Sequence, residues 1–127
     1  MSTFRVAIEL GDPTGTRWVE VEALAGTGAT YISAPAHILQ DLGVVPHVRA
    51  SFVLGGGREV QRDIGHAWVR IGDRSAITLV VFAEPGAPVL LGAYALDGLL
   101  LAADPVGRRL VPAPACLLTE QPAFGSQ

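Results

Sequence analysis

Several features that would assign this chain to a class of protein are scarce or missing from its sequence. Of its 127 residues only Cys116 is a cysteine, so no disulfide forms within the chain, and this mildly favours a reducing compartment. The 9 basic residues are outnumbered by 12 acidic ones and are scattered, so no basic stripe follows a phosphate backbone. Nucleic acid is therefore not an expected partner.

Signals for export or membrane insertion are also missing. The first five residues lack the basic-then-apolar layout of a signal peptide. The most apolar stretch, residues 86–103, contains Pro88, Asp97 and three glycines, which is typical of core segments and not of a membrane span. We expect a cytoplasmic protein that does not associate with a membrane.

Metal and cofactor sites have no signature in the sequence. The three histidines, His37, His47 and His66, do not have the spacing of metal ligands, and no second cysteine joins them. There is no Gly-x-Ser-x-Gly motif. The glycines at 55–57 match neither a P-loop nor a dinucleotide fingerprint, because no helix is expected after them. We expect no metal and no cofactor.

The residues that are present indicate a β-rich globular domain. Half of them are apolar and only 17% are charged, which favours one compact fold over disorder. Short helices are expected at residues 34–43, ended by Gly43, and at residues 93–97, ended by Gly98. Many short strands separated by turn residues favour a small closed β-barrel or a sandwich. The expected strands cover residues 4–10, 18–23, 31–33, 48–54, 58–64, 66–71, 75–82, 89–92, 99–103 and 109–111.

One tight turn, residues 24–30, organises the chain. Two glycines, Gly26 and Gly28, flank Thr27 there, so the backbone turns sharply after an alternating strand. A loop of this kind often presents functional groups to a cleft. From Ala23 to Ser33, however, there is no Asp, Glu, His, Cys or Lys, so the loop carries no reactive group.

The order of these parts resembles the retropepsin-like aspartic proteases, in particular their bacterial single-domain members. The resemblance covers about residues 19–112. It is carried by the Gly-Thr-Gly-Ala-Thr of residues 26–30, the Leu-Gly-Val of 42–44, the Gly-tipped hairpin, the Leu-Leu-Gly of 90–92, and the closing residues 104–111. Retroviral members have Arg after that later glycine, whereas this chain has Ala93, which points to the cellular branch.

This resemblance implies a fold, an assembly and a set of roles. It implies an all-β fold, a small closed barrel of the acid-protease type with one or two short helices. A single domain would span residues 1–112, followed by a loosely ordered tail at 113–127. It implies a homodimer that holds a peptide or protein segment in a groove. Within the loop, Thr27 would hydrogen-bond across the dimer, Gly28 would let substrate backbone approach, and Ala29 and Thr30 would line the first subsites. Gly55, Gly56 and Gly57 would form the tip of the flap. Leu90, Leu91 and Gly92 would pack beneath the loop.

The sequence departs from the family at one decisive position. Where the family has the catalytic aspartate of Asp-Thr-Gly, this chain has Gly26. In that chemistry two carboxylates share one proton, one activating the water and the other protonating the carbonyl oxygen. Glycine can do neither, and Glu22, four residues upstream on a strand, lies too far away to substitute. We therefore expect no catalytic residue and a proteolytically inactive domain.

Two alternatives remain open at the level of sequence. In one, the chain is an inactivated variant of an active aspartic endopeptidase, and Gly26→Asp restores activity. In the other, it is a monomeric β-barrel interaction module whose likeness to the proteases is only architectural. For the glycines at 55–57 a plain flexible loop is an equally good interpretation.

Overall fold

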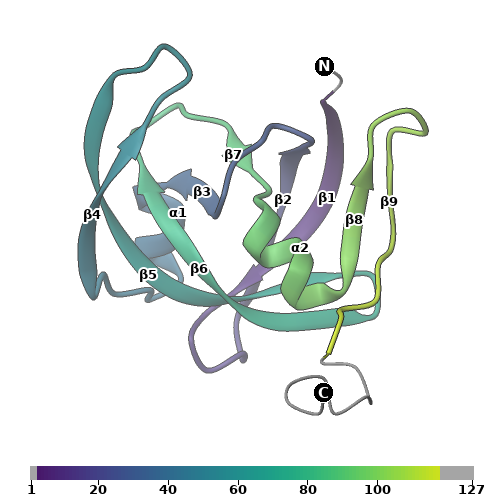
Figure 1. Cartoon of the computed structure of the whole chain (residues 1–127). Helices are drawn as coiled ribbons and strands as arrows, with labels where there is room; N and C mark the ends of the chain where they lie inside the picture. The colour runs from purple at the N-terminus through teal and green to yellow at the C-terminus, as the bar shows by residue number, and fades with distance from the viewer. Residues whose placement is uncertain (1–2, 118–127) are drawn as a thin grey trace, which may run out of the picture.

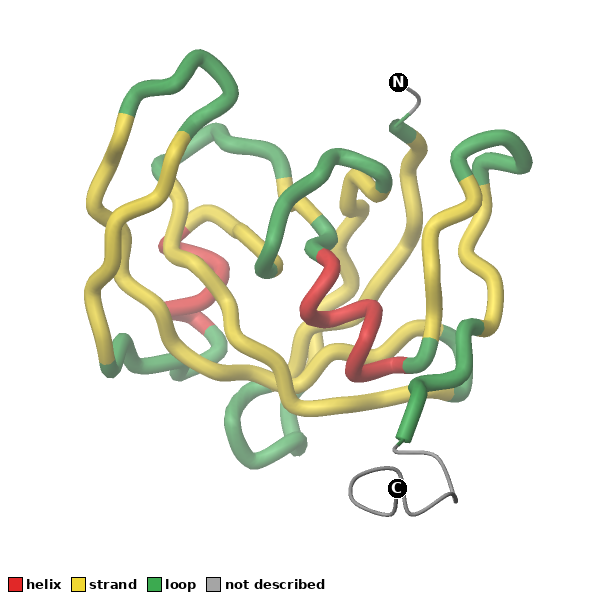
Figure 2. Tube along the Cα trace, in the orientation of Figure 1, coloured by secondary structure: helices red, strands yellow, loops and turns green. Residues whose placement is uncertain are grey.

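The computed structural model describes residues 3–117 (Figure 1, Figure 2). Two short helices, α1 (Ala36–Asp41) and α2 (Ala93–Leu99), accompany the strands. No helix in this described range is long and apolar enough to cross a membrane. The strands are β1 (Phe4–Gly11), β2 (Trp18–Ala25), β3 (Ile32–Pro35), β4 (Val48–Val53), β5 (Glu59–Ile71), β6 (Arg74–Ala83), β7 (Val89–Leu90), β8 (Leu101–Asp104) and β9 (Arg109–Pro112).

Six of the strands close into a barrel. The order β1-β2-β7-β3-β6-β5 returns to β1 because β5 also pairs with β1, so the ring has no open edge. β4 pairs only with β5, and the hairpin that these two strands form extends beyond the ring (Figure 1). The expected all-β fold, a small closed barrel with one or two short helices, is confirmed.

The hairpin of β1 and β2 follows from the alternation of apolar and polar residues. The two strands are antiparallel, with inward-facing Ile8 and Leu10 buried in β1 and Ala23 and Ala25 buried in β2. Glu20 and Glu22, which alternate with the inward-facing residues of β2, are exposed. This alternation holds one register, since a slip by one residue would turn the apolar set toward solvent.

The β5 strand corrects one prediction. The sequence predicts two strands, at 58–64 and 66–71, separated at Gly65, but β5 runs unbroken from Glu59 to Ile71. A Cβ on Gly65 would lie 2.8 Å from Val44 Cγ1 and 2.9 Å from the Val45 carbonyl oxygen. The glycine therefore marks a close approach of the segment after α1, and it does not break the strand.

Both helices also differ from their predicted bounds. Helix α1 begins at Ala36 with Pro35 as its N-cap, and Gly43 follows it with a left-handed φ of 80°. Helix α2 continues through Gly98 to Leu99, so the prediction that Gly98 ends it was wrong. Leu100 takes the left-handed C-terminal position instead, with φ 59°. Gly98 lies where a Cβ would make only an ordinary contact, 3.6 Å from Ala76 Cβ.

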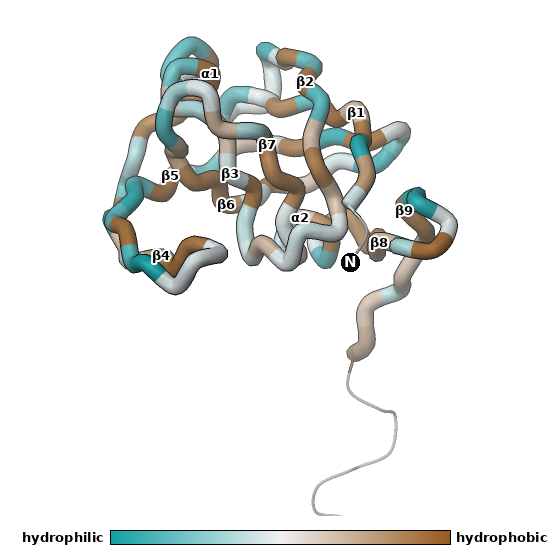
Figure 3. Tube along the Cα trace, turned by 90° about the horizontal axis from the view of Figure 1, so that it is seen from above, coloured by the Kyte–Doolittle hydropathy of each residue, from teal (hydrophilic) through white to brown (hydrophobic). Residues whose placement is uncertain are grey.

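The core lies inside the ring and under α2. Hydrophobic residues follow β7 through the middle of the molecule when it is seen from above (Figure 3). The largest fully buried side chains of the core come from four different strands, α1 and the segment before α2, so the core links distant parts of the chain. These side chains are Ile8, Leu10, Ile32, Leu39, Val69, Val80 and Leu91.

The C-terminal strands stand apart from the barrel. β8 and β9 form a separate two-stranded sheet, which contacts α2 through β8. Residues 113–117 form no helix or strand, although the Ala113 N–H donates to the Leu100 carbonyl oxygen at 2.9 Å. The rest of the predicted loose tail, residues 118–127, lies outside the described residues. The division into a domain at 1–112 and a tail stays a prediction.

Candidate functional site

The loop between β2 and β3, residues 26–30, is built on two left-handed glycines. Gly26 has φ 77° and Gly28 has φ 83°, a region that side-chain-bearing residues rarely adopt. Between them, the Thr27 hydroxyl oxygen accepts a hydrogen bond from the Ala29 N–H at 3.2 Å. The sharp turn that the sequence predicts here is present, and it is closed by a hydroxyl group and not by a carboxylate.

The loop is held in place by the backbone that leads into α2. The Leu91 N–H donates to the Leu24 carbonyl oxygen at 2.8 Å, the Ala93 N–H to that of Ala29 at 3.0 Å, and the Tyr94 N–H to that of Thr30 at 2.8 Å. These bonds attach both ends of the loop to one rigid element. Figure 2 shows the loop in green running directly above the first turn of α2.

Gly92 lies at the closest point between these two segments. A Cβ at this position would be 2.4 Å from the Tyr31 carbonyl carbon and 2.6 Å from that of Thr30. Leu90 pairs with both Leu24 and Ser33, so β7 joins the strands on either side of the loop. The structure therefore brings residues 90–92 against residues 24–31, and only glycine permits the spacing at 92.

A cavity of about 440 Å³ opens on one side of the loop. Its volume falls in the range of small-molecule and peptide-side-chain pockets. Apolar side chains make up most of its wall, with one arginine and one glutamate. The lining residues are Gly28, Ala29, Thr30, Tyr31 and Ser33 from the loop and β3; Phe52, Val53, Leu54, Val60 and Arg62 from the β4–β5 hairpin; and Val81, Ala83, Glu84, Ala87, Pro88 and Leu90 from β6, β7 and their connection.

The β4–β5 hairpin reaches this cavity through an aromatic contact. The ring of Phe52 on β4 meets the ring of Tyr31 edge to face at a centroid distance of 6.2 Å, and Tyr31 meets Tyr94 of α2 in the same way at 5.5 Å. Edge-to-face pairs at these distances are mutually attractive. The three rings therefore join the hairpin, the loop and the helix.

The glycines at 55–57 form the tip of that hairpin. The Gly57 N–H donates to the Leu54 carbonyl oxygen, and the Leu54 N–H to that of Arg58, each at 2.8 Å. The glycines are exposed and do not line the cavity, whereas Phe52, Val53 and Leu54 before them do. The predicted flap residues thus lie beyond the part of the hairpin that borders the cavity.

A second cavity of about 290 Å³ lies on the other side of the loop. Gly26 and Thr27 border it together with side chains of α2 and β8. Its only ionisable lining residue is Asp97. Neither cavity therefore places a pair of carboxylates beside the loop, as acid–base catalysis by a carboxylate dyad would require.

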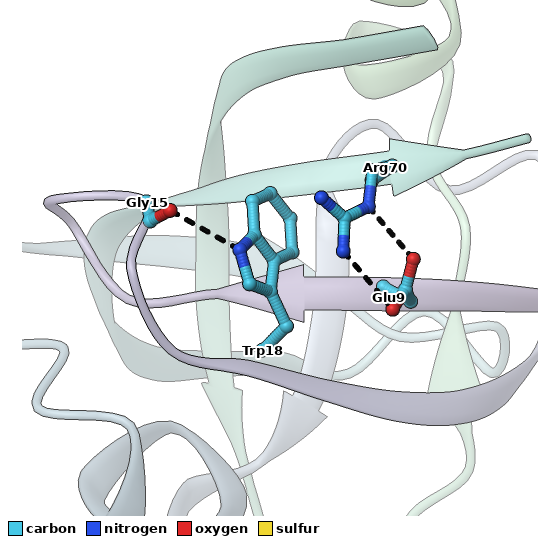
Figure 4. Close-up of polar contacts among 4 residues, drawn as sticks. All are labelled: Glu9, Gly15, Trp18 and Arg70. Atoms are coloured by element: carbon cyan, nitrogen blue, oxygen red, sulfur yellow. Dashed lines mark hydrogen bonds and ion pairs between the residues drawn. The ribbon is translucent and has the colours of Figure 1, made fainter. Parts of the chain in front are cut away.

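A cluster with a charged pair lies at the opposite end of β2. There the guanidinium of Arg70 forms two hydrogen bonds to Glu9, at 2.8 and 3.2 Å, and stacks over the Trp18 ring with its Cζ 3.8 Å from the ring centroid (Figure 4). The hydrogen bond from Arg70 lowers the pKa of Glu9. Trp18 Nε1 donates to the Gly15 carbonyl oxygen at 3.1 Å. This cluster ties β1, β2 and β5 together where the barrel closes.

The histidines do not form a ligand set. His37, His47 and His66 are exposed, and only the rings of His47 and His66 are close to one another, at 5.7 Å. In the described range, no three His, Cys, Asp or Glu side chains are grouped so that they could hold a metal ion.

The sequence analysis did not identify three residues that shape the larger cavity, Tyr31, Phe52 and Arg62. Tyr31 and Phe52 are recognisable in retrospect, since only 6% of the residues are aromatic and these two flank the loop and the glycine tip. The residues around Arg62 in the sequence do not indicate that it lines the cavity, because its place there depends on the pairing of β5 with β6.

Comparisons with known proteins find similarity among solved structures and not among sequences. No protein-family model matches the sequence, and no curated protein matches it. Among solved structures, the chain is similar to the solution structure of the protease of simian foamy virus (mac), with 20% sequence identity and a TM-score of 0.49. The match covers 72% of this chain and 91% of that one.

Proposed function

We propose that this chain is a retropepsin-like domain that keeps the loop and groove of an aspartic endopeptidase but lacks its catalytic carboxylate. In this proposal it is proteolytically inactive, forms a homodimer and binds a peptide or protein segment. The observation that carries the proposal is the loop at 26–30, which borders a cavity of about 440 Å³ and bears no ionisable group.

The surroundings of the loop support a scaffold built to hold it. Its ends are bonded to the segment leading into α2, and the β4–β5 hairpin covers the adjoining cavity. A rigid loop in a largely apolar groove suits the binding of an extended peptide, since the groove supplies apolar contact and the loop supplies backbone hydrogen bonds.

In this proposal the loss of catalysis lies in the loop itself, at Gly26. With φ 77° the position favours glycine, and among other residues Asp and Asn tolerate it best. General acid–base catalysis contributes about 10²–10⁴-fold to a rate, and Gly26 removes the group that would supply it. Asp97, the ionisable residue of the second cavity, projects from α2 and not from the loop.

In the proposed homodimer, two such loops face each other. Thr27 would donate its hydroxyl hydrogen across the dimer while its oxygen accepts from Ala29 N–H within the same chain. A symmetric dimer would then lack both carboxylates at once.

The wild type and two variants at position 26 test this proposal. The wild type, Gly26→Asp and Gly26→Asn are assayed for cleavage of casein and of a mixed peptide library between pH 4 and 7, and their masses are measured by light scattering. We expect dimers for all three and no cleavage by the wild type or by Gly26→Asn, which has the same shape as aspartate without its charge.

The outcomes separate the proposal from its alternatives. Cleavage by the wild type would overturn it. Cleavage by Gly26→Asp alone would identify the chain as an inactivated variant of an active endopeptidase. A wild type that is monomeric and binds no peptide would favour an interaction module with only architectural likeness.

A further inference from the structure

The larger cavity contains two charged side chains in an otherwise uncharged wall. Among its lining residues, Arg62 and Glu84 are the only charged ones, and they pair at 2.9 Å between Arg62 Nη2 and Glu84 Oε1. The remaining wall is largely apolar and includes the side chains of Tyr31, Phe52 and Leu90. Any ligand that enters therefore meets one ion pair beside an apolar pocket.

The two partners of this pair are not equivalent. The side chain of Arg62 is 26% exposed, whereas that of Glu84 is 67% exposed. Arg62 lies within β5 and also donates from Nη1 to the Gln61 carbonyl oxygen at 3.0 Å. Glu84 begins the turn after β6, in which the Ala87 N–H donates to its carbonyl oxygen. Arg62 is thus part of the wall, and Glu84 is a solvated partner at the rim.

We propose that Arg62 makes the cavity selective for ligands that carry a carboxylate next to an apolar group, which in a peptide means an acidic residue beside a large apolar one. The ligand carboxylate takes the place of Glu84, whose exposed side chain moves into water. The peptide nature of the ligand rests on the proposed function, whereas the selectivity rests on the cavity alone.

The charge balance favours an anionic ligand over a cationic one. An exposed ion pair contributes little, so exchanging Glu84 for another carboxylate costs little. A cationic ligand would draw Glu84 away and leave the half-buried guanidinium without a carboxylate partner, which is unfavourable. A guanidinium also presents five N–H donors in a planar fork that suits a carboxylate.

The selectivity is measured with small probes of one shape and different charge. 4-Phenylbutyrate, 4-phenylbutanamide and 4-phenylbutylamine are titrated into the full chain and followed by NMR. For the wild type we expect the carboxylate to bind about tenfold more tightly than the amide, as a charge-assisted hydrogen bond provides. The amine should bind most weakly, and the resonances of Tyr31, Phe52 and Leu90 should move.

Substitutions identify the residue responsible. Arg62→Gln should bind carboxylate and amide equally, whereas Glu84→Gln should bind the carboxylate a few-fold more tightly because its competitor is gone. Arg49→Gln is the matched control: Arg49 lies on the neighbouring strand β4, pairs with Asp63 at 2.9 Å and does not line the cavity, so its selectivity should stay at the wild-type value.

Equal binding of carboxylate and amide by the wild type would overturn the proposal, as would a preference that survives Arg62→Gln. If Arg62→Gln fails to fold, unchanged carboxylate affinity in Glu84→Gln overturns the proposal equally.

A second titration uses the hexapeptides Ala-Ala-Leu-Phe-Glu-Ala and Ala-Ala-Leu-Phe-Gln-Ala. If the small probes bind selectively but neither peptide binds, the proposed peptide groove is contradicted and the role of Arg62 is not. If both peptides bind with equal affinity, the role of Arg62 is contradicted and the peptide groove is not.

Discussion

The two ends of strand β2 carry two tight turns that are stabilised in opposite ways. At its start, residues 12–17, the Asp12 carboxylate accepts hydrogen bonds from the backbone N–H groups of Thr16 and Arg17, at 2.8 and 2.9 Å, and from the Thr14 hydroxyl at 2.8 Å. At its end, residues 26–30, no ionisable side chain is present, and backbone bonds to the segment before α2 hold the loop.

Both turns contain a left-handed glycine, Gly15 in the first and Gly26 in the second. The two turns thus share a need for glycine and differ in the groups that anchor them. A turn held by its own carboxylate is encoded locally and titrates with pH. A turn held by a distant backbone depends on the packing of that segment and is indifferent to pH. Of the two turns, the uncharged loop beside the cavity is the one that a ligand can contact with the smaller cost of desolvation.

The largest expected effect comes from removing the space that the second turn needs. Gly92→Ala places a Cβ 2.4 Å from the Tyr31 carbonyl carbon, a backbone atom that cannot rotate away. We expect a loss of about 3 kcal/mol in the free energy of unfolding, measured by urea denaturation. Gly98→Ala is the matched control in the same region, and because it has room and lies inside α2 it should raise stability by about 0.5–1 kcal/mol. A neutral Gly92→Ala would show that the α2 segment does not anchor the loop.

A smaller effect should follow from side chains at the left-handed positions. A Cβ on Gly28 would have no neighbour within 4 Å, so Gly28→Ala isolates the conformational cost of φ 83°, about 1–2 kcal/mol. Gly15→Ala in the first turn adds to this a contact 3.1 Å from Trp68 Nε1 and should cost more. Denaturation of the two variants side by side tests whether the turns share a backbone requirement. A Gly28→Ala variant as stable as the wild type would break the comparison.

The smallest effect is the pH dependence of the first turn. The backbone hydrogen bond from Arg17 is the main cause that lowers the pKa of Asp12 to about 2 from 3.8. Because the folded-state pKa lies below the unfolded one, the stabilisation is complete above about pH 4 and is lost as the pH falls towards 2. The melting temperature of Asp12→Asn should therefore be lower at neutral pH and should change less than that of the wild type between pH 4 and 2. Identical pH profiles would show that Asp12 is not the anchor.

Much of the fold was predictable because its signals are local. The β1–β2 hairpin follows from strict alternation, and the gap between the predicted strands at 66–71 and 75–82 matches the turn between β5 and β6. The two errors, at Gly65 and Gly98, have one form: a glycine was interpreted as the end of an element that in fact continues through it. At Gly65 the segment of Val44 and Val45 leaves no room for a Cβ. At Gly98 the helix simply continues, because Leu100 adopts the left-handed conformation in its place.

The candidate site divides in the same way. The absence of any ionisable group between Ala23 and Ser33 is a property of the sequence, and so is the placement of Thr27 between two glycines. These facts alone determine that the loop has no acid or base of its own, since no fold adds a side chain. The alternation of apolar and polar residues that builds the β1–β2 hairpin is likewise a property of the sequence. Only the tertiary structure decided that residues 90–92 support the loop, that Phe52 and Tyr31 meet, and that Arg62 lines the cavity with Glu84. These contacts join residues 21 to 67 positions apart, and such pairings follow from barrel closure, which no local pattern encodes.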